Sequence, residues 1–309
     1  MKINCPSLKC KKSLSNSPND GSIVRNGSYF RTSDSRRIRR YHCGSCNLHF
    51  SAATIDPRIR QKKRRINPLL RKLICSEVSQ RRAAIIIGVN RKTIVRHFRF
   101  LARQSELEHI SWMKSQYAKN PILSLQFDDL ETSEHTKCKP VSVALAVEAN
   151  HRKILNFKVS QMPARGLLTK KAFEKYGFRK DRRSMGWNLM MKELKPHVHT
   201  EAVFTSDENP HYPKYLKRHH PKATHVQIKG GRGAITGQGE LKKLKYDPIF
   251  SLNHTCAMLR ANINRLIRKT WCTTKTIKGL TDHLWIYVVY HNQILTQNQH
   301  ASGPVSIDS

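Results

Sequence analysis

Carboxylates are the side chains of this sequence best suited to chemistry, because acidic residues are scarce. The chain has 21 Asp and Glu against 57 Lys and Arg. Asp128 and Asp129 begin its densest acidic cluster, which would repel phosphate unless cations lay between them. Asp207 directly follows the short apolar run of residues 202–206. Carboxylates of this kind can hold the two divalent cations, about 3.5 to 4 Å apart, that commonly serve phosphodiester cleavage and strand transfer.

The periodicity of a strand separates the two neighbouring aspartates. Side chains alternate across a strand, so Asp128 shares a face with Ser124 and Gln126, whereas Asp129 lies on the apolar face. This alternation favours Asp128 as the metal ligand. Asp207 is the expected second ligand because it stands between a strand and the breaker at residues 209–210.

A third ligand is expected late in the chain, and two candidates are open. The amphipathic pattern of residues 249–270 predicts a helix that places Asn253 and Arg260 on one polar face, because seven residues are nearly two turns. Asn253 would coordinate Mg²⁺ through its amide oxygen, and Arg260 would face a phosphate. Glu240, beside a glycine-rich loop and 33 residues after Asp207, is the competing ligand. A carboxylate would hold the cation more tightly, because the amide carries no charge.

Four N-terminal cysteines predict a zinc site. Cys5 and Cys10 form one pair, and Cys43 and Cys46 form another. Two such pairs supply the four thiolates of a structural tetrahedral zinc site. Residues 1–55 have little apolar content, so they could not fold without such a cross-link. The alternative is that these thiols are small buried apolar side chains.

The segment between the cysteine pairs has the pattern of a ribbon. Asn26-Gly27 predicts a tight turn between two short strands. His42 and His49 flank the second cysteine pair and could replace a ligand, although four thiolates already complete a site. Together these features predict a zinc ribbon.

Residues 67–104 have the periodicity of helices and contain a helix-turn-helix pattern. Gly88 stands where a tight turn between two helices needs a residue without Cβ. The second helix, about 91–101, carries candidates for phosphate and major-groove contacts: Arg91, Lys92, Thr93, Arg96 and Arg99. An amphipathic hairpin with a solvated basic face would have the same pattern.

The remaining elements predict an α/β domain. Strands are expected at residues 122–129, 141–148, 154–160, 202–206 and 224–229, and helices at 185–194, 211–219, 249–270 and 280–292. This order is that of the ribonuclease-H-like fold with a mixed five-stranded sheet. The chain is therefore expected to be multidomain: 1–55 a small zinc ribbon, 56–115 an all-α helix-turn-helix domain, 116–295 the ribonuclease-H-like catalytic domain and 296–309 a flexible tail.

The composition indicates the class of partner. A formal net charge of +36 needs a polyanion to neutralise it, so nucleic acid is expected and a membrane surface is the weaker alternative. No stretch approaches the roughly 18 to 20 apolar residues of a spanning helix, and the start lacks the apolar core of a signal peptide. We expect a cytosolic protein whose eight Cys are thiols or metal ligands rather than disulfides.

Several of these motifs together resemble one family. They are the ribbon of residues 5–46 followed by Asn-Leu-His-Phe-Ser, the helix-turn-helix, Phe-Asp-Asp at 127–129, Ser-Asp-Glu at 206–208, and the run of residues 259–275. Over nearly the whole chain, the sequence resembles DDE transposases of the insertion-sequence-one type and their relatives. In that family a late helix carries Glu with a basic residue seven positions later. Here Asn253 and Arg260 match those positions, as in related groups that use Asn as the third ligand.

The resemblance implies a reaction, cofactors and partners. It implies a transposase that binds the terminal inverted repeats of an insertion sequence, cleaves DNA strands with Mg²⁺ or Mn²⁺ and transfers the freed 3′ hydroxyl into target DNA. The partners would be double-stranded DNA at the element ends and the target, with a homodimer or higher oligomer on DNA. The setting would be a prokaryotic cytoplasm, in association with the nucleoid.

Two other functions remain open. A DNA-binding regulator of transposition would keep the ribbon and the helix-turn-helix but lack cleavage, because its third acid is lost. An RNA-binding or ribonucleolytic protein could share the fold and the charge. A recognition helix, however, suits the major groove of B-form DNA better than the narrow groove of RNA.

Overall fold

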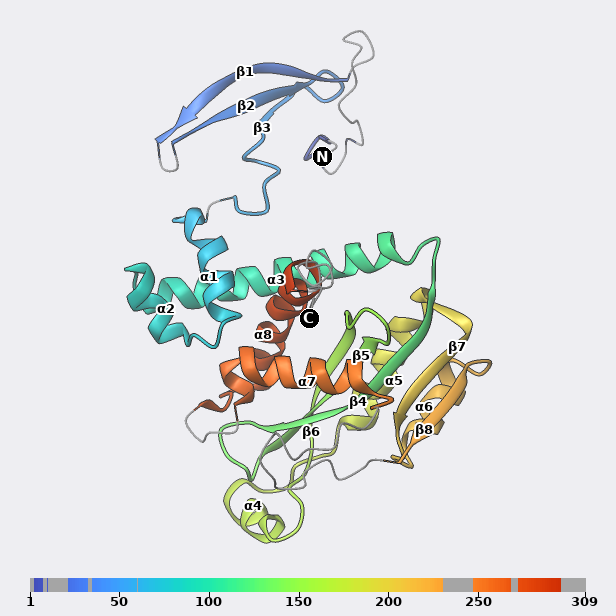
Figure 1. Cartoon of the computed structure of the whole chain (residues 1–309). Helices are drawn as coiled ribbons and strands as arrows, with labels where there is room; N and C mark the ends of the chain where they lie inside the picture. The colour runs from blue at the N-terminus through green and yellow to red at the C-terminus, as the bar shows by residue number, and fades with distance from the viewer. Residues whose placement is uncertain are drawn as a thin grey trace, which may run out of the picture. The chain divides into compact units, whose positions relative to one another are not determined.

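The computed structural model describes residues 3–7, 10, 22–32, 35–59, 61–229, 247–267 and 272–295. The chain divides into two compact units, Met1–Pro68 and Leu69–Ser309, and Figure 1 shows their elements. The segment expected to form a helix-turn-helix therefore lies largely in the same unit as the large sheet. No helix in the described part of the chain is long and apolar enough to cross a membrane.

The first unit is built on a three-stranded antiparallel sheet. Its strands are β1 (Ile23–Arg31), β2 (Arg36–Cys43) and β3 (Leu48–Ser51), in that order across the sheet. Tyr41 and Phe50 stack with ring centroids 5.5 Å apart. They form a small core with Ile23 and two of the cysteines, Cys5 and Cys43. Five buried side chains make a small core, which is consistent with a need for a further cross-link.

The tight turn predicted at Asn26-Gly27 is wrong. β1 continues through both residues to Arg31, and its pairing with β2 shifts between Arg25 and Ser28. Gly27 has φ of 68°, in the left-handed region. A glycine in this conformation accommodates the extra residue of a β-bulge, so the pair that signals a turn here bends a continuous strand.

Three helices from residue 67 onward, all but the first two residues in the second unit, bear out the predicted pattern. They are α1 (Asn67–Ile74), α2 (Gln80–Ile87) and α3 (Arg91–Gln116). Gly88 follows α2 with φ of 69°, and its N–H donates to the carbonyls of Ala84 and Ile85. The Asn90 side chain then caps α3 by accepting from Lys92 N at 2.8 Å. Helix, tight left-handed turn and helix thus follow one another as predicted.

A mixed five-stranded sheet forms the body of the second unit, as predicted. The strands lie in the order β6-β5-β4-β7-β8. β4 (Ile122–Ser133), β5 (Pro140–Glu148) and β6 (Ile154–Gln161) are antiparallel neighbours, whereas β7 (Val198–Asp207) runs parallel to β4 and β8 (Thr224–Ile228) runs parallel to β7. The carboxyl ends of β4 and β7 therefore point the same way.

Helices pack on both faces of this sheet. On one face lie α5 (Arg183–Leu194) and α6 (Tyr212–His219), whose Trp187 and Tyr212 contact Phe127 of β4. On the other face lie α7 (Phe250–Asn262) and α8 (Ile277–Tyr290), and Trp285 of α8 contacts Phe157 of β6 with ring centroids 4.5 Å apart. The structure also contains α4 (Leu168–Tyr176), which was not expected from the sequence, and short helical turns at 64–66, 195–197, 264–266 and 291–295.

The late helix is shorter than predicted. α7 ends at Asn262, and Ile263 has the extended angles φ −104° and ψ 105°. The carbonyl of Asn262 accepts a hydrogen bond from Glu77 N at 2.8 Å, so a distant segment takes the acceptor that another turn of helix would use. The expected continuous helix over 249–270 is therefore corrected to one that stops two residues after Arg260.

Candidate functional site

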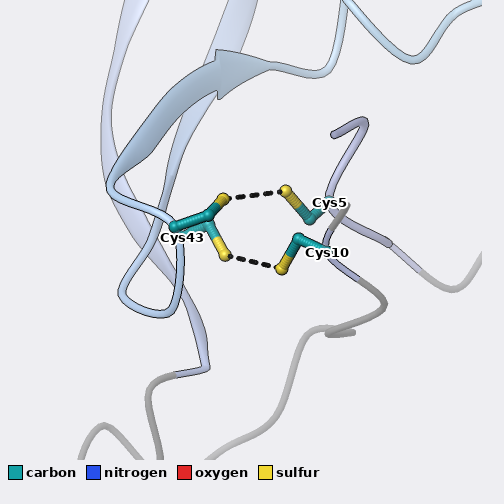
Figure 2. Close-up of side chains that lie close together, drawn as sticks. Cys5, Cys10 and Cys43 are labelled. Carbon is teal, nitrogen blue, oxygen red and sulfur yellow. Dashed lines mark hydrogen bonds between the residues drawn. The ribbon is translucent and has the colours of Figure 1, made fainter. Parts of the chain in front are cut away.

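Four cysteines of the first unit form a cluster. The Sγ atoms of Cys5 and Cys46 are 3.5 Å apart, and those of Cys10 and Cys43 are 3.6 Å apart. All four sulfurs lie within 4.8 Å of one another, and in Figure 2 the side chains of Cys5, Cys10 and Cys43 point into one small space. Sulfurs around a tetrahedral zinc with bonds of about 2.3 Å are about 3.8 Å apart. The cluster could therefore hold a metal ion such as zinc.

Local backbone geometry presents the second cysteine pair. Cys43 ends β2, and Cys46 lies in the turn that leads to β3. Burial opposes ionisation of Cys43, but hydrogen bonds from the backbone at Cys46 and Ser45, together with the neighbouring thiols, lower its pKa to about 7, whereas burial and the hydrogen bond with Cys43 raise the pKa of Cys46 to about 12. A thiol that ionises near neutral pH is suited to metal ligation, because the thiolate is the ligand.

The two flanking histidines lie outside the cysteine cluster. Their rings are in contact, tilted by 32°, with centroids 4.4 Å apart. His42 Nε2 contacts Asn47 Oδ1 at 2.7 Å, and His49 Nδ1 accepts from Asn26 Nδ2 at 3.1 Å. Neither belongs to the group of residues whose ligand atoms converge.

In the second unit, Asp128 and Asp207 lie on neighbouring parallel strands. β4 and β7 pair residue for residue from Ser124 with Val203 to Gln126 with Thr205. Extending this register by two residues sets Asp128 opposite Asp207. Directly opposite residues of parallel strands point to the same face, and the charge of Asp207 contributes to raising the pKa of Asp128. The two aspartates predicted from the sequence are thus brought together.

The surroundings of Asp128 disfavour its ionised form. Burial is the main cause, and the charges of Asp207 and Asp129 add to it. Hydrogen bonds from Asp129 N at 2.7 Å and Tyr212 Oη at 3.0 Å favour the carboxylate but only in part offset these effects. The net result raises the pKa of Asp128 from 3.8 to about 6. A cation beside Asp128 would favour the ionised form.

Asp129 points to the opposite face of the sheet. Its carboxylate accepts hydrogen bonds from Ser142 Oγ at 2.5 Å and Trp187 Nε1 at 3.1 Å. Burial raises its pKa, while these two donors lower it. Asp129 therefore links β4, β5 and α5, in agreement with the strand alternation that favoured its neighbour as the metal ligand.

The side chain of Gln126 fixes the start of α7 against the same face as Asp128. Its Nε2 donates to Pro248 O at 2.9 Å, and its Oε1 accepts from Leu252 N at 2.9 Å. One turn farther along α7, the thiol of Cys256 is close enough to Asp128 and Arg260 for both charges to affect its pKa. Burial is the largest cause and raises the pKa of Cys256 to about 12, so this thiol stays protonated at neutral pH. Cys256 thus lies within electrostatic reach of both Asp128 and Arg260.

The predicted third ligand lies near a carboxylate that the sequence did not single out. Asn253 is exposed, and its Nδ2 donates to Asp247 Oδ2 at 2.8 Å. Asp247 also accepts from Ile249 N at 3.0 Å, which holds its carboxylate at the start of α7. Among the described residues, no partner is found for the amide oxygen of Asn253. The competing candidate, Glu240, lies outside the described residues.

The cations predicted to contact DNA lie on the first turns of α3. Arg91, Lys92, Arg96 and Arg99 are exposed, and Thr93 is half-buried. In the part of the chain that the structure describes, none of these cations pairs with an acid. The buried side of the same helix carries Ile94, Phe98 and Leu101, so the positive charge is concentrated on the solvent side.

A scan against models of known protein families finds no match for this chain, and a search among curated proteins finds none either. Function is therefore inferred from the geometry of the two sites.

Sequence reasoning missed three residues that shape the carboxylate site. Tyr212 donates to Asp128, Gln126 fixes α7, and Asp247 holds Asn253. Gln126 gave a detectable signal, since a polar amide between apolar strand residues needs buried partners. Asp247 immediately precedes a proline at a helix start, where Asp often caps, whereas nothing in the sequence pairs Tyr212 with Asp128.

Proposed function

We propose that this protein is a DNA transposase of the DDE type, whose second unit is a ribonuclease-H-like catalytic domain. The observation that carries this proposal is the closeness of Asp128, two residues beyond the stretch of β4 that pairs with β7, to Asp207, the last residue of β7. The sheet order β6-β5-β4-β7-β8 supports the proposed fold. The site lies beside α7, where the third ligand is expected.

The residues of the proposed site suit divalent cations. Asp128 and Asp207 would hold Mg²⁺ or Mn²⁺, which when bound activates the attacking hydroxyl and stabilises the leaving oxygen. Tyr212 holds one oxygen of Asp128 through its hydroxyl, so that the carboxylate is oriented before a cation arrives. Arg260, on the last turn of α7, would bind a phosphate oxygen of the substrate.

The third position is proposed to be Asn253. Its amide oxygen is available, and Asp247 holds its nitrogen. Glu240 remains the alternative ligand. The lack of charge on an amide also favours a second candidate function, a DNA-binding regulator that does not cut.

DNA is proposed as the partner of both units. The exposed cations at the start of α3 are suited to phosphates and base edges of a major groove. The cysteine cluster is proposed to be the zinc site of a ribbon that also contacts DNA, with the chain acting as a dimer or higher oligomer on the inverted repeats. The net charge of +36 is consistent with such a partner.

A cleavage assay tests the proposal. The full-length protein is incubated with Mg²⁺ or Mn²⁺ and the DNA that flanks its coding region, and strand cleavage is compared with binding. We expect Asp128→Ala and Asp207→Ala each to abolish cleavage while DNA binding persists. Asp181→Ala is the matched control, because this aspartate pairs with Arg183 at a distance of 2.5 Å. Retained cleavage in either site variant would overturn the assignment.

Two further comparisons separate the remaining alternatives. Asn253→Ala and Glu240→Ala, assayed side by side, identify the third ligand by which one loses cleavage. Binding without cleavage by the unmodified protein, under all metal conditions, would instead favour the regulator.

A further inference from the structure

A large cavity in the second unit lies apart from the carboxylate pair. Its volume is about 1110 Å³, slightly above the roughly 300 to 1,000 Å³ of ordinary small-molecule pockets. One wall comes from the end of α1 to the start of α3, and the opposite wall comes from residues 264–267 and 272–276 and from the start of α8. These elements lie close together because α3 packs against α8 (Figure 1). Neither Asp128 nor Asp207 lines the cavity.

The lining of this cavity is strongly positive. The wall from α2 and α3 contributes Arg81, Arg82, Arg91 and Arg99. The opposite wall contributes Arg265, Lys275 and Lys278. Only Glu77 and Asp282 are acidic, so seven cations against two acids leave a formal charge of +5.

Few of these charges are compensated within the protein. Lys278 pairs with Asp282 at 3.0 Å. For Arg81, Arg99 and Lys275, no ion pair with a described acid is found. Like charges in one concave surface repel each other and produce a strong positive potential there. A bound polyanion would reduce this repulsion.

The cavity also has features that go beyond a charged surface. Arg265 is half-buried: its guanidinium lies 5.7 Å from the ring centroid of Phe98, and its Nη1 donates to Thr274 Oγ1 at 3.2 Å. A Cβ on Gly279 would lie 3.3 Å from Nη1 of the same guanidinium, so the glycine leaves room for it. A planar guanidinium held in this way presents its remaining N–H groups in a fixed direction, and such groups match phosphate oxygens.

We propose that this cavity is a phosphate-binding site that takes several linked phosphates, as in the sugar–phosphate backbone of a nucleic acid. The inference rests on the proposed DNA-binding function and extends it to residues outside the recognition helix. Arg91 and Arg99 are two turns apart on α3, about 12 Å, whereas one strand of B-DNA carries a phosphate about every 3.4 Å along its axis. The lining therefore spans more than one phosphate. A free polyphosphate shares this chemistry, so the experiment must distinguish the two sources.

The test uses a double variant that removes one charge from each wall. Arg81→Gln with Lys275→Gln changes two exposed side chains that lie outside the proposed major-groove contacts. The matched control, Arg103→Gln with Lys192→Gln, removes the same charge from exposed positions that do not line the cavity. Thermal melting without ligand checks that both variants fold.

DNA affinity is then measured against salt concentration. Removing one cation that binds a DNA phosphate should reduce the slope of log affinity against log salt by about 0.9. We expect the slope of the cavity variant to fall by about twice that amount and the control to keep the slope of the unmodified protein. Equal slopes in all three proteins, or equal reductions in the two variants, would overturn the inference while leaving DNA binding itself intact.

A second arm uses inorganic tripolyphosphate in a thermal-shift titration. If the unmodified protein fails to bind DNA but tripolyphosphate stabilises it and not the cavity variant, the cavity binds a free polyphosphate and the proposed function fails. If neither DNA nor tripolyphosphate distinguishes the cavity variant from its control, the cavity is not a phosphate site.

Discussion

Asp128→Asn should stabilise the metal-free protein at neutral pH while it destroys the proposed catalytic function. The carboxylate of Asp128 is disfavoured by burial and by the neighbouring Asp207, which together raise its pKa from 3.8 to about 6. An amide has no charge to bury. It also keeps an oxygen that can accept the hydrogen bonds from Asp129 N and Tyr212 Oη.

The magnitude follows from the difference between the folded and unfolded pKa values. Because the folded pKa is the higher one, the folded state binds the proton more tightly, so Asp128 costs no stability below pH 3.8. That cost grows as the pH rises through about 6. Near pH 7 the ionised Asp128 costs about 3 kcal/mol relative to a side chain that stays neutral, and near pH 4.5 it costs only about 1 kcal/mol. The free energy of unfolding of Asp128→Asn should therefore be higher than that of the unmodified protein by these amounts.

The assay is urea unfolding in the presence of a chelator, at both pH values, with and without Mg²⁺. Asp181→Asn is the control of opposite sign, because the hydrogen bond from Arg183 lowers the pKa of Asp181. That variant should lose stability at neutral pH. Adding Mg²⁺ should stabilise the unmodified protein and leave Asp128→Asn unchanged. A variant at position 128 that is less stable near pH 7, or a gain that does not shrink towards pH 4.5, would refute the reasoning.

Three further predictions concern single side chains. Tyr212→Phe removes the hydroxyl that donates to Asp128 at 3.0 Å, so the pKa of the Asp128 carboxyl should rise further. An NMR titration of Asp128 measures this pKa, and a lower value in the variant would contradict the prediction. Cys46→Ser leaves three thiols in the cluster, so bound zinc, measured by atomic spectroscopy, should drop well below that of the unmodified protein, whereas Cys272→Ser, outside the cluster, should not change it. Gly88→Ala forces a side chain into φ of 69°, which should cost about 1 kcal/mol in urea unfolding; an unchanged midpoint would show that the turn relaxes.

Local pattern predicted the sheet and its two aspartates well, because each feature depends on neighbouring residues. Alternation along residues 122–129 distinguishes Asp128 from Asp129, and the structure places their side chains on opposite faces. The cysteine cluster could be predicted equally well, because the spacing within each cysteine pair reflects the geometry of metal ligands. These signals need no knowledge of what packs against the element.

Features that depend on contacts with distant segments could not be predicted from local sequence patterns. Asn26-Gly27 suits both a hairpin turn and a bulge, and pairing with β2 selects the bulge. The end of α7 is set by Glu77 N, which comes from a distant part of the sequence and takes the carbonyl of Asn262. Tyr212 could not be predicted for the same reason, because only the fold brings α6 close to Asp128 of β4.

Asn253, at the third position of the proposed site, is a better metal ligand than its lack of charge suggests. The carboxylate of Asp247 accepts from Asn253 Nδ2 at 2.8 Å. A hydrogen bond of this kind fixes which end of the amide is the nitrogen and makes its oxygen a better ligand, as carboxylates behind metal-bound histidines do for the imidazole. Gln126 adds a positional constraint, because its two hydrogen bonds tie the first turn of α7 to the strand that carries Asp128. The start of α7, next to Asn253, is thus held against β4 by the Gln126 side chain, and the side-chain torsions of Asn253 are left to be set when a cation binds.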